Sequence, residues 1–262
     1  MINQKTLGYD VRLRDLFRLM RVEDYGTFIQ LIIGFVLAGG RDWIYLAGAL
    51  AILAPCVYGG LYALNDAHDA DADRLHPLKK TRPVAAGRID PHLATMLGAG
   101  LIGFGVGIAF ATDGRVLALA LLFIVINLAY TFKFKTVPYL EILLNTITHP
   151  LRFAAGLWLA GSWEHGILLA PWFLAALAIT TLKRIKEMHE SGPAVRSVLK
   201  HYEETTLRGL ITVSVALLAG IWPLTRNEDF VLTGLWLTLT LAAVVGYFHS
   251  PFVRQLEEHL WR

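Results

Sequence analysis

The stretch 65–83, NDAHDADADRLHPLKKTRP, constrains this chain more than any other part of it. It directly follows an apolar run, 47–64, that is long enough to cross a membrane. If the helix of that run continues, Asn65, Asp69 and Asp73 recur at i, i+4 and i+8, with Asp66 three residues before Asp69. Carboxylates on one helix face repel each other, so this acidic face favours a cation shared between them.

The chemistry of the acidic face suits magnesium. Mg²⁺ prefers oxygen ligands, and it commonly binds one or two carboxylates together with substrate phosphates and water. The basic residues Lys79, Lys80 and Arg82 follow within the same stretch and supply positive charge for phosphate groups. The predicted metal ligands and catalytic residues are Asp66, Asp69 and Asp73, and Asn65, Lys79, Lys80 and Arg82 are predicted to bind substrate. A solvated acidic loop between two spans is the alternative interpretation.

Composition places the chain in a membrane. Hydrophobic residues make up 55% of it, and the mean hydropathy is +0.50, well above the balance of soluble domains. Eight predominantly apolar segments are long enough to span as helices, at 24–40, 43–64, 93–112, 115–132, 138–160, 166–182, 206–224 and 230–248. We therefore predict an all-α, polytopic membrane bundle that forms a single domain over residues 1–262.

The distribution of positive charge orients this bundle. Of the 24 Lys and Arg residues, only Arg41, Arg115 and Arg226 lie in turns on the outer side, and Arg152 alone lies inside a span. The positive-inside rule then places both termini and the acidic face on the cytoplasmic side of the inner membrane. The polar, basic N-terminus contains no cleavable signal pattern, and segment 1–22 is predicted to lie on the membrane lipids as an interfacial amphipathic helix.

The fifth predicted span is unusually polar. Glu141, Asn145, Thr148 and Arg152 recur at i, i+4, i+7 and i+11 and so share one helix face. Ionisable side chains inside a membrane face a wet cavity or pair with one another. We expect this face to line a polar substrate cavity, with a self-contained Glu141–Arg152 network as the alternative.

A second charged patch, KRIKEMHE, ends the sixth predicted span. Its members Lys183, Arg184, Glu187 and Glu190 follow helical spacing. Acidic and basic residues at two cytoplasmic helix ends predict that the protein binds a diphosphate through Mg²⁺. The predicted reaction is departure of this diphosphate from a carbon atom, while the metal and the basic side chains stabilise the charge of the leaving group. The sequence contains no Gly-rich phosphate loop, serine triad setting or Cys/His zinc spacing, and nothing in it indicates nucleic-acid binding.

The segment NDAHDADAD has the form N-D-x-x-D-x-x-x-D and resembles the first motif of the UbiA superfamily of intramembrane prenyltransferases. The downstream RPVAAG, the YTFKFK loop and the second charged patch follow in the order expected for that family. The resemblance implies a helical bundle, usually of nine spans, around a central cavity open to the bilayer, in which Mg²⁺ bridges two acidic motifs to a diphosphate. We expect further substrate contacts from Tyr130, Lys133, Asn145 and Arg152.

The second motif of that family is usually D-x-x-x-D, whereas this chain has Glu187 and Glu190 with the extra cations Lys183, Arg184 and Lys186. Together with HPLKKTRP, this pattern resembles the decaprenyl-phosphate phosphoribosyltransferase branch, which joins phosphoribosyl diphosphate to a polyprenyl phosphate. We therefore predict an Mg²⁺-dependent transferase acting on a polyprenyl lipid, with phosphoribosyl transfer as the favoured reaction.

Two other functions fit the same residues. One is prenyl transfer from a prenyl diphosphate to an aromatic or lipid acceptor, and the other is membrane transport, for which intramembrane Glu141 and Arg152 also serve. The sequence leaves open the length of the lipid and the oligomeric state. It also leaves open the roles of His68 and His76, which we interpret as loop residues.

Overall fold

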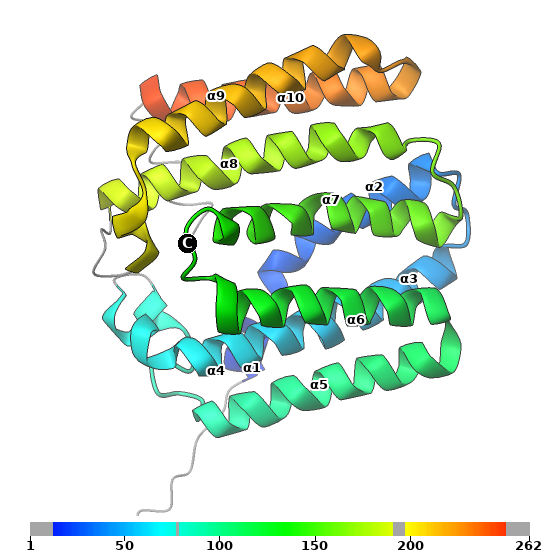
Figure 1. Cartoon of the computed structure of the whole chain (residues 1–262). Coiled ribbons are helices and arrows are strands. Elements are labelled where there is room, and N and C mark those ends of the chain that lie inside the picture. Colours follow the sequence, from blue (N-terminus) through cyan, green and yellow to red (C-terminus); the bar gives the residue numbers. More distant parts are fainter. Residues whose placement is uncertain (1–12, 77–78, 191–196, 250–262) are drawn as a thin grey trace, which may run out of the picture. The chain divides into compact units, whose positions relative to one another are not determined.

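The computed structural model describes residues 13–76, 79–190 and 197–249 of the chain, and in this part it contains helices and no strand. The α-helices are α1 (Leu13–Leu19), α2 (Ile29–Leu37), α3 (Trp43–Ala51), α4 (Gly59–Leu75), α5 (Pro91–Thr112), α6 (Gly114–Ala129), α7 (Leu140–Ala160), α8 (Leu169–Glu190), α9 (Glu204–Ile221) and α10 (Asn227–His249) (Figure 1). Short 3-10 segments are η1 (Val22–Phe28), η3 (Lys79–Thr81), η5 (Gly166–Leu168), η6 (Ser197–His201) and η7 (Trp222–Leu224), and π-helical segments are η2 (Ile52–Tyr58) and η4 (Tyr130–Phe134).

Six helical stretches in the described part are long and apolar enough to cross a membrane. They are Trp43–Leu75, Pro91–Thr112, Gly114–Phe134, Gly166–His189, Glu204–Leu224 and Asn227–Phe248. The predicted all-α membrane fold is therefore confirmed. The two remaining predicted spans fall on η1–α2 and on α7, so the total of eight stays a prediction.

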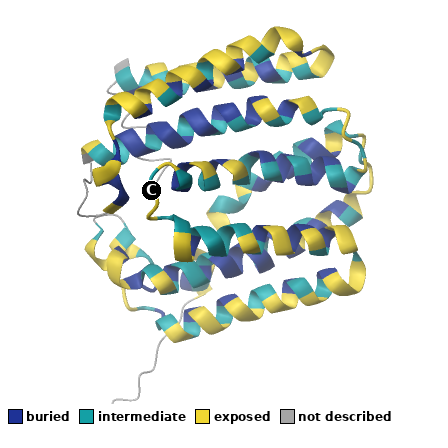
Figure 2. Ribbon diagram, in the orientation of Figure 1, coloured by how far each residue is buried: buried dark blue, intermediate teal, exposed yellow. Residues whose placement is uncertain are grey.

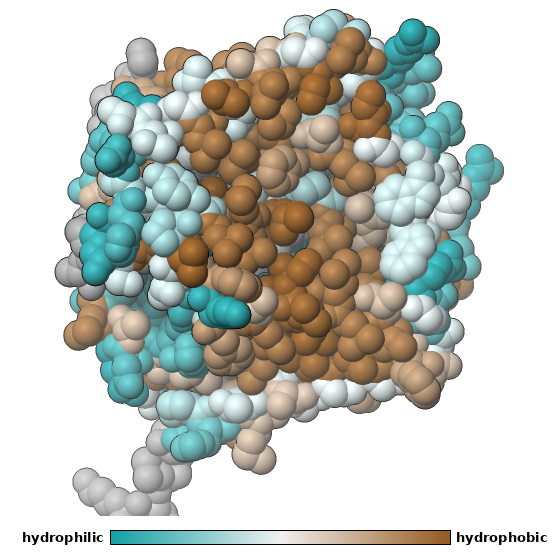
Figure 3. Space-filling view, viewed as in Figure 1, coloured by the Kyte–Doolittle hydropathy of each residue, from teal (hydrophilic) through white to brown (hydrophobic). Residues whose placement is uncertain are grey.

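The helix surfaces are those of a protein surrounded by lipid. On α5, Met96, Phe104 and Phe110 are 72%, 64% and 80% exposed, and exposed residues recur along this helix (Figure 2). Figure 3 shows hydrophobic residues along the middle of the helices in view and hydrophilic residues mainly toward the helix ends. Water would penalise so much exposed apolar area, whereas the hydrocarbon of a bilayer does not.

The chain divides into two compact units. The first comprises Met1–Gly26 and Ala47–Ile124, and the second comprises Thr27–Leu46 and Val125–Arg262. The acidic face thus belongs to the first unit, while the polar fifth span and the second charged patch belong to the second. The prediction of a single domain stays a prediction. Of the predicted interfacial segment 1–22, residues 1–12 lie outside the described residues, and helix α1 follows them.

Close packing of α4 against α5 organises the first unit. A Cβ atom added at Gly60 would lie 2.6 Å from the backbone oxygen of Gly98, and one added at Gly98 would lie 2.7 Å from the backbone oxygen of Gly60. Glycine at both positions therefore allows the two backbones to approach each other directly. Helix α5 begins at Pro91, where the Asp90 carboxylate accepts hydrogen bonds from the backbone N–H groups of the first turn.

The second unit is built around α7. Gly34 on α2 and Gly156 on α7 again allow close approach, because a Cβ at either one would collide with the backbone of the other helix. The ring of Trp172 on α8 stacks on Phe153 of α7 with 4.6 Å between centroids. A separate buried cluster joins the beginning of α7 and the end of α8 to η6 and α9. These contacts hold the C-terminal end of α8, which is predicted to lie on the cytoplasmic side, against α7, η6 and α9.

Candidate functional site

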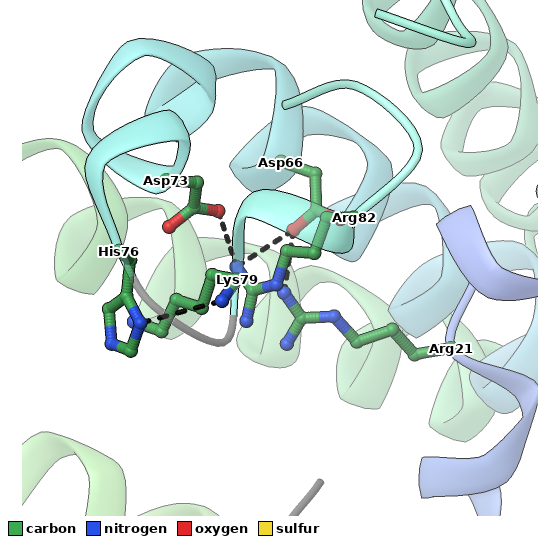
Figure 4. Close-up of polar contacts among 6 residues, drawn as sticks. All are labelled: Arg21, Asp66, Asp73, His76, Lys79 and Arg82. Atoms are coloured by element: carbon green, nitrogen blue, oxygen red, sulfur yellow. Dashed lines mark hydrogen bonds and ion pairs between the residues drawn. The ribbon is translucent and has the colours of Figure 1, made fainter. Parts of the chain in front are cut away.

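The acidic face lies on α4, which extends from Gly59 in the apolar run to Leu75, and Figure 4 shows the side chains of its Asp66 and Asp73. Asp66 is 1% exposed and Asp73 is 4% exposed. They lie seven residues apart, two turns of an α-helix, and therefore point from the same side. The helical continuation on which the predicted spacing depended is confirmed. Asn65 and Asp69 are half-buried beside them, and His68 is exposed on the same helix rather than in a loop.

Arg82 lies across the two buried carboxylates. Its Nη1 donates to Asp73 Oδ2 at 2.7 Å and to Asp66 Oδ1 at 3.3 Å. The turn that carries Arg82 is held in place because Val84 and Ile89 are fully buried in a cluster with Ala63, Ala70 and Leu19. The sequence predicted that Arg82 binds phosphate, and in this structure its guanidinium is directed at the predicted metal ligands.

A second arginine, Arg21, reaches the same carboxylate from a segment 45 residues away. Its Nη2 donates to Asp66 Oδ1 at 2.6 Å, and its guanidinium lies over the ring of Tyr62, 4.6 Å from the centroid. Tyr62 precedes Asp66 by one helical turn, so these two side chains form a cradle for the arginine. Burial is the largest single effect and lowers the pKa of Arg21, but the attraction and hydrogen bond from Asp66, together with the smaller effects of Tyr62 and Asp24, raise this pKa above its ordinary value. Arg21 lies far from the acidic stretch in the sequence and was not among the predicted site residues.

The other predicted cations of this stretch lie at the turn below α4. The backbone N–H of Lys79 faces His76 Nδ1 at 3.4 Å (Figure 4). Lys80 is exposed, and Lys79 is half-buried. His76 directly follows α4 and has an extended backbone conformation, so the helix does not continue past Leu75.

The donor set fits a hard divalent cation in its chemistry, although it is not assembled as a metal centre. Within the described residues, no three Asp, Glu, His or Cys side chains gather closely enough to hold a metal ion. Asp66 Oδ2 is buried and has no hydrogen-bond partner, and a buried carboxylate oxygen needs a ligand to offset its lost hydration. The Arg82 guanidinium already places positive charge between Asp66 and Asp73, where a metal would serve the same electrostatic purpose.

In the second unit, Glu141 is fully buried and forms the centre of a polar cluster. Arg184 donates to both of its carboxylate oxygens, at 2.5 Å and 2.8 Å, and the hydroxyl of Tyr202 donates to Oε1 at 2.8 Å. This cluster connects the first turn of α7, the last third of α8 and the residue that follows η6. Burial and the adjacent Glu141 carboxylate raise the pKa of Tyr202. Tyr202 was not selected from the sequence, because nothing local to it indicates a buried ion pair.

The pairing of Glu141 with Arg184 corrects the alternative in which Glu141 and Arg152 form one network. Arg152 instead donates to the backbone oxygen of Thr148 at 3.1 Å, and its guanidinium lies 5.4 Å from the ring centroid of Phe28. It is buried at 4% exposure. Asn145, on the same helix, is half-buried. The predicted cavity lining by Asn145 and Arg152 stays a prediction.

The remaining predicted residues of the second unit lie on η4 and in the last part of α8. Tyr130 is half-buried at the beginning of η4, and Lys133 is exposed in the same segment. Lys183 is half-buried, and Glu187 contacts Arg184 Nη1 at 3.0 Å. Glu190 ends α8, and its side chain lies outside the described residues. Arg184 is therefore occupied by two carboxylates, which makes it a poor direct ligand for a phosphate group.

Comparison with known proteins extends these findings. The model of the UbiA prenyltransferase family matches residues 27–262. The chain is 32% identical over 230 residues to decaprenyl-phosphate phosphoribosyltransferase from Corynebacterium glutamicum, which covers 80% of this chain and 68% of that protein. It is 30% identical over 192 residues to the protein of the same name from Mycobacterium tuberculosis, covering 69% of this chain and 61% of that one.

The fold also has a solved counterpart. A UbiA homolog from Archaeoglobus fulgidus, bound to GPP and Mg²⁺, superposes with a TM-score of 0.74 at 20% sequence identity, over 87% of this chain and 84% of that one. At this identity the likeness concerns the fold alone.

Proposed function

Because this chain belongs to the UbiA prenyltransferase family and is therefore a transferase and an integral membrane protein, we propose that it transfers a phosphoribosyl group from phosphoribosyl diphosphate to a polyprenyl phosphate. In this reaction an oxygen of the lipid phosphate forms a bond to C1 of the ribose. The bond from C1 to the diphosphate breaks, and the diphosphate leaves with the electron pair. The names of the bacterial relatives support this choice of substrates.

The observation that carries the proposal is the buried acidic face of α4 with arginine directly beside it. Asp66, Asp69 and Asp73 would hold Mg²⁺, with Asn65 as a neighbouring oxygen donor. When bound, the metal would neutralise charge that develops on the departing diphosphate. Arg82, Lys79 and Lys80 follow the acidic residues closely enough to bind the phosphate oxygens themselves.

The second charged patch supports phosphoribosyl transfer over prenyl transfer. A phosphoribosyl diphosphate and a lipid phosphate together bring more negative charge than a prenyl diphosphate and a neutral acceptor, and Lys183 and Lys186 would offset it. Glu187 and Glu190 take the places of the usual second acidic motif. Arg184 would act through its bonds to Glu141, as a residue that fixes the position of this patch. Tyr130, Lys133, Asn145 and Arg152 are the proposed additional contacts to substrate.

The proposed location follows from charge. Nearly all Lys and Arg residues lie in segments that alternate along the chain with the outer turns. Both termini and the diphosphate site would therefore lie on the cytoplasmic side of the inner membrane. Soluble phosphoribosyl diphosphate and Mg²⁺ are accessible from that side. The polyprenyl lipid would enter from the surrounding bilayer.

The direct test uses membranes that contain the protein, incubated with labelled phosphoribosyl diphosphate, polyprenyl phosphate and Mg²⁺. We expect label to enter the lipid fraction, and Asp69→Ala to lower that rate about 100-fold or more. Asp71→Asn is the matched control, because its carboxylate is 93% exposed on the same helix and pairs with Arg74. Turnover of a prenyl diphosphate without any phosphoribosyl lipid would replace the proposed reaction with prenyl transfer, and flux of solute without covalent product would indicate a transporter.

A further inference from the structure

Two arginines occupy the carboxylates that we assign to the metal. We propose that Arg21 and Arg82 exclude a free divalent cation from the acidic face, so that this face accepts a metal ion only together with a diphosphate that draws the arginines away. The inference rests on the proposed function, since it concerns the order in which the same site fills.

The geometry supplies the first step of the argument. Asp66 Oδ1 accepts from both arginines, at 2.6 Å from Arg21 and 3.3 Å from Arg82, and Asp73 Oδ2 accepts from Arg82 at 2.7 Å. Figure 4 shows both guanidinium groups directed toward Asp66. A cation that needs carboxylate oxygens at about 2.1 Å competes for the same lone pairs and is repelled by the two positive charges.

The charges supply the second step. Asp66, Asp69 and Asp73 contribute three negative charges and Arg21 and Arg82 contribute two positive ones, so these five side chains together carry a formal charge of −1. Adding a divalent ion alone makes the site net positive while two arginines already pair with its carboxylates, which is costly in a largely buried place. A diphosphate that enters with the ion brings further negative charge, and guanidinium groups bind phosphate oxygens in a bidentate manner.

Features of Arg21 and Asp66 show that this arrangement is more than an ordinary surface ion pair. Arg21 adopts a left-handed backbone conformation with φ of 50°, which is unfavourable for a residue with a side chain, while its guanidinium contacts Tyr62 and Asp66. Asp66 still has its Oδ2 atom buried without a partner. The carboxylate is thus held by arginine on one oxygen and available to a further ligand on the other.

The test measures metal and diphosphate separately on the purified full-length protein. Binding of Mn²⁺ alone is followed from the loss of its free-ion EPR signal, and binding of inorganic pyrophosphate at saturating Mg²⁺ is followed by calorimetry. We expect Arg21→Gln to bind Mn²⁺ about 10-fold more tightly than the unaltered protein, because a competing cation is gone. We expect the same variant to bind pyrophosphate about 10-fold more weakly, because a phosphate ligand is gone.

Opposite changes in the two affinities are the diagnostic result, since damage to the fold would weaken both. Arg82→Gln should show the same opposite changes, and it decides the matter if Arg21→Gln does not fold. Arg74→Gln is the control, because Arg74 pairs on the same helix with the exposed Asp71, and it should change neither affinity. Equal loss of both affinities, or Mn²⁺ binding that is unchanged in both arginine variants, would overturn the inference.

The outcome is separable from that of the proposed function. If the unaltered protein makes no phosphoribosyl lipid but the arginine variants still show opposite affinity changes, the acceptor or donor is wrong and the order of binding stands. If the lipid product forms while the affinities fall together, the function stands and the exclusion of free metal is wrong.

Discussion

At the scale of single residues, the second unit depends on one fully buried carboxylate. Glu141 accepts three hydrogen bonds, two from Arg184 and one from Tyr202. A buried charge is tolerated only when its partners are complete, because each missing donor leaves part of the desolvation cost unopposed. The hydroxyl of Tyr202 is the one donor of the three that can be removed without removing a charge.

Tyr202→Phe should therefore lower the free energy of unfolding by about 1–3 kcal/mol near neutral pH. The pKa of Tyr202 is raised above its ordinary value of 10, so the folded protein holds this proton more tightly than the unfolded chain does. The stabilisation is complete below pH 10 and is lost as the pH rises above it. The difference between the two proteins should accordingly shrink above pH 10 in thermal melts recorded over a pH series.

Tyr139→Phe is the control for this measurement. Its ring packs edge-on against Tyr202 with 5.2 Å between centroids, and the side chain is 38% exposed. The substitution keeps that ring contact and should change stability by less than about 0.5 kcal/mol at any pH. A gap between Tyr202→Phe and the unaltered protein that stays constant through pH 11 would show that the hydroxyl's proton is not involved.

The spacing of residues along the sequence was enough to predict the acidic face. The partners of its side chains became visible only in the structure. The i, i+4, i+8 pattern of Asn65, Asp69 and Asp73 is local, so a continuous helix is enough to place these side chains together. The contact of Arg21 with Asp66 joins segments 45 residues apart, and no periodicity encodes such a pair. Glu141 and Arg152 share a helix face, and their spacing suggested that they pair. In the structure the bidentate partner of Glu141 is Arg184, which comes from another helix.

At the scale of elements, the position of the acidic face depends on how closely α4 approaches α5. Gly60 and Gly98 bring the two backbones together one and a half turns before Asn65. The length of the apolar segments predicted both spans, but it does not predict how closely two helices approach each other. Which glycine faces the partner helix was not predictable, because glycines recur there at almost every second residue.

Gly98→Ala should destabilise the protein by about 1–3 kcal/mol, because the added methyl group meets backbone that has little room to move. Lipid-product formation should fall with it, as the shift is transmitted to the acidic face. The measurement is the thermal melt of the purified protein together with the labelled-lipid assay.

Gly100→Ala on the same helix is the matched control. A Cβ added there has no atom within 4 Å, so only the intrinsic helix preference changes, and stability should stay equal or rise by about 0.5–1 kcal/mol. If the two substitutions were equally harmful, the close contact between α4 and α5 would not be what places the site.

At the scale of the whole molecule, the arrangement of charge along the chain determines how it lies in the bilayer. The sequence predicted a membrane protein because long apolar segments are strong signals, and six of the eight predicted spans meet the criteria of length and hydropathy in the described residues. The other two are harder to recognise from composition, since α2 has only nine residues and α7 carries Glu141 and Arg152 among its apolar residues.

Single cysteines introduced into loops test the predicted orientation. With Cys56, which is buried, replaced by serine, Ser162→Cys should react with a membrane-impermeant maleimide added to intact cells, because the turn between α7 and α8 is predicted to lie outside. Thr136→Cys, in the turn before α7, should react only after the membrane is permeabilised. The reverse labelling pattern would place the diphosphate site on the outer side and would contradict the predicted topology.

The π-helical segment η2 lies directly before α4 and contains Pro55, and its position sets the angular phase of everything that follows. Each residue added to an α-helix rotates the later side chains by about 100° around the axis. The wider π-helical turn, which accommodates an extra residue, therefore decides toward which side the aspartates of α4 project. Cys56 in the same segment packs closely against Gly105 of α5. If this segment were a regular α-helix, the sequence would still contain every aspartate, but their carboxylates would point in another direction and would no longer reach Arg21.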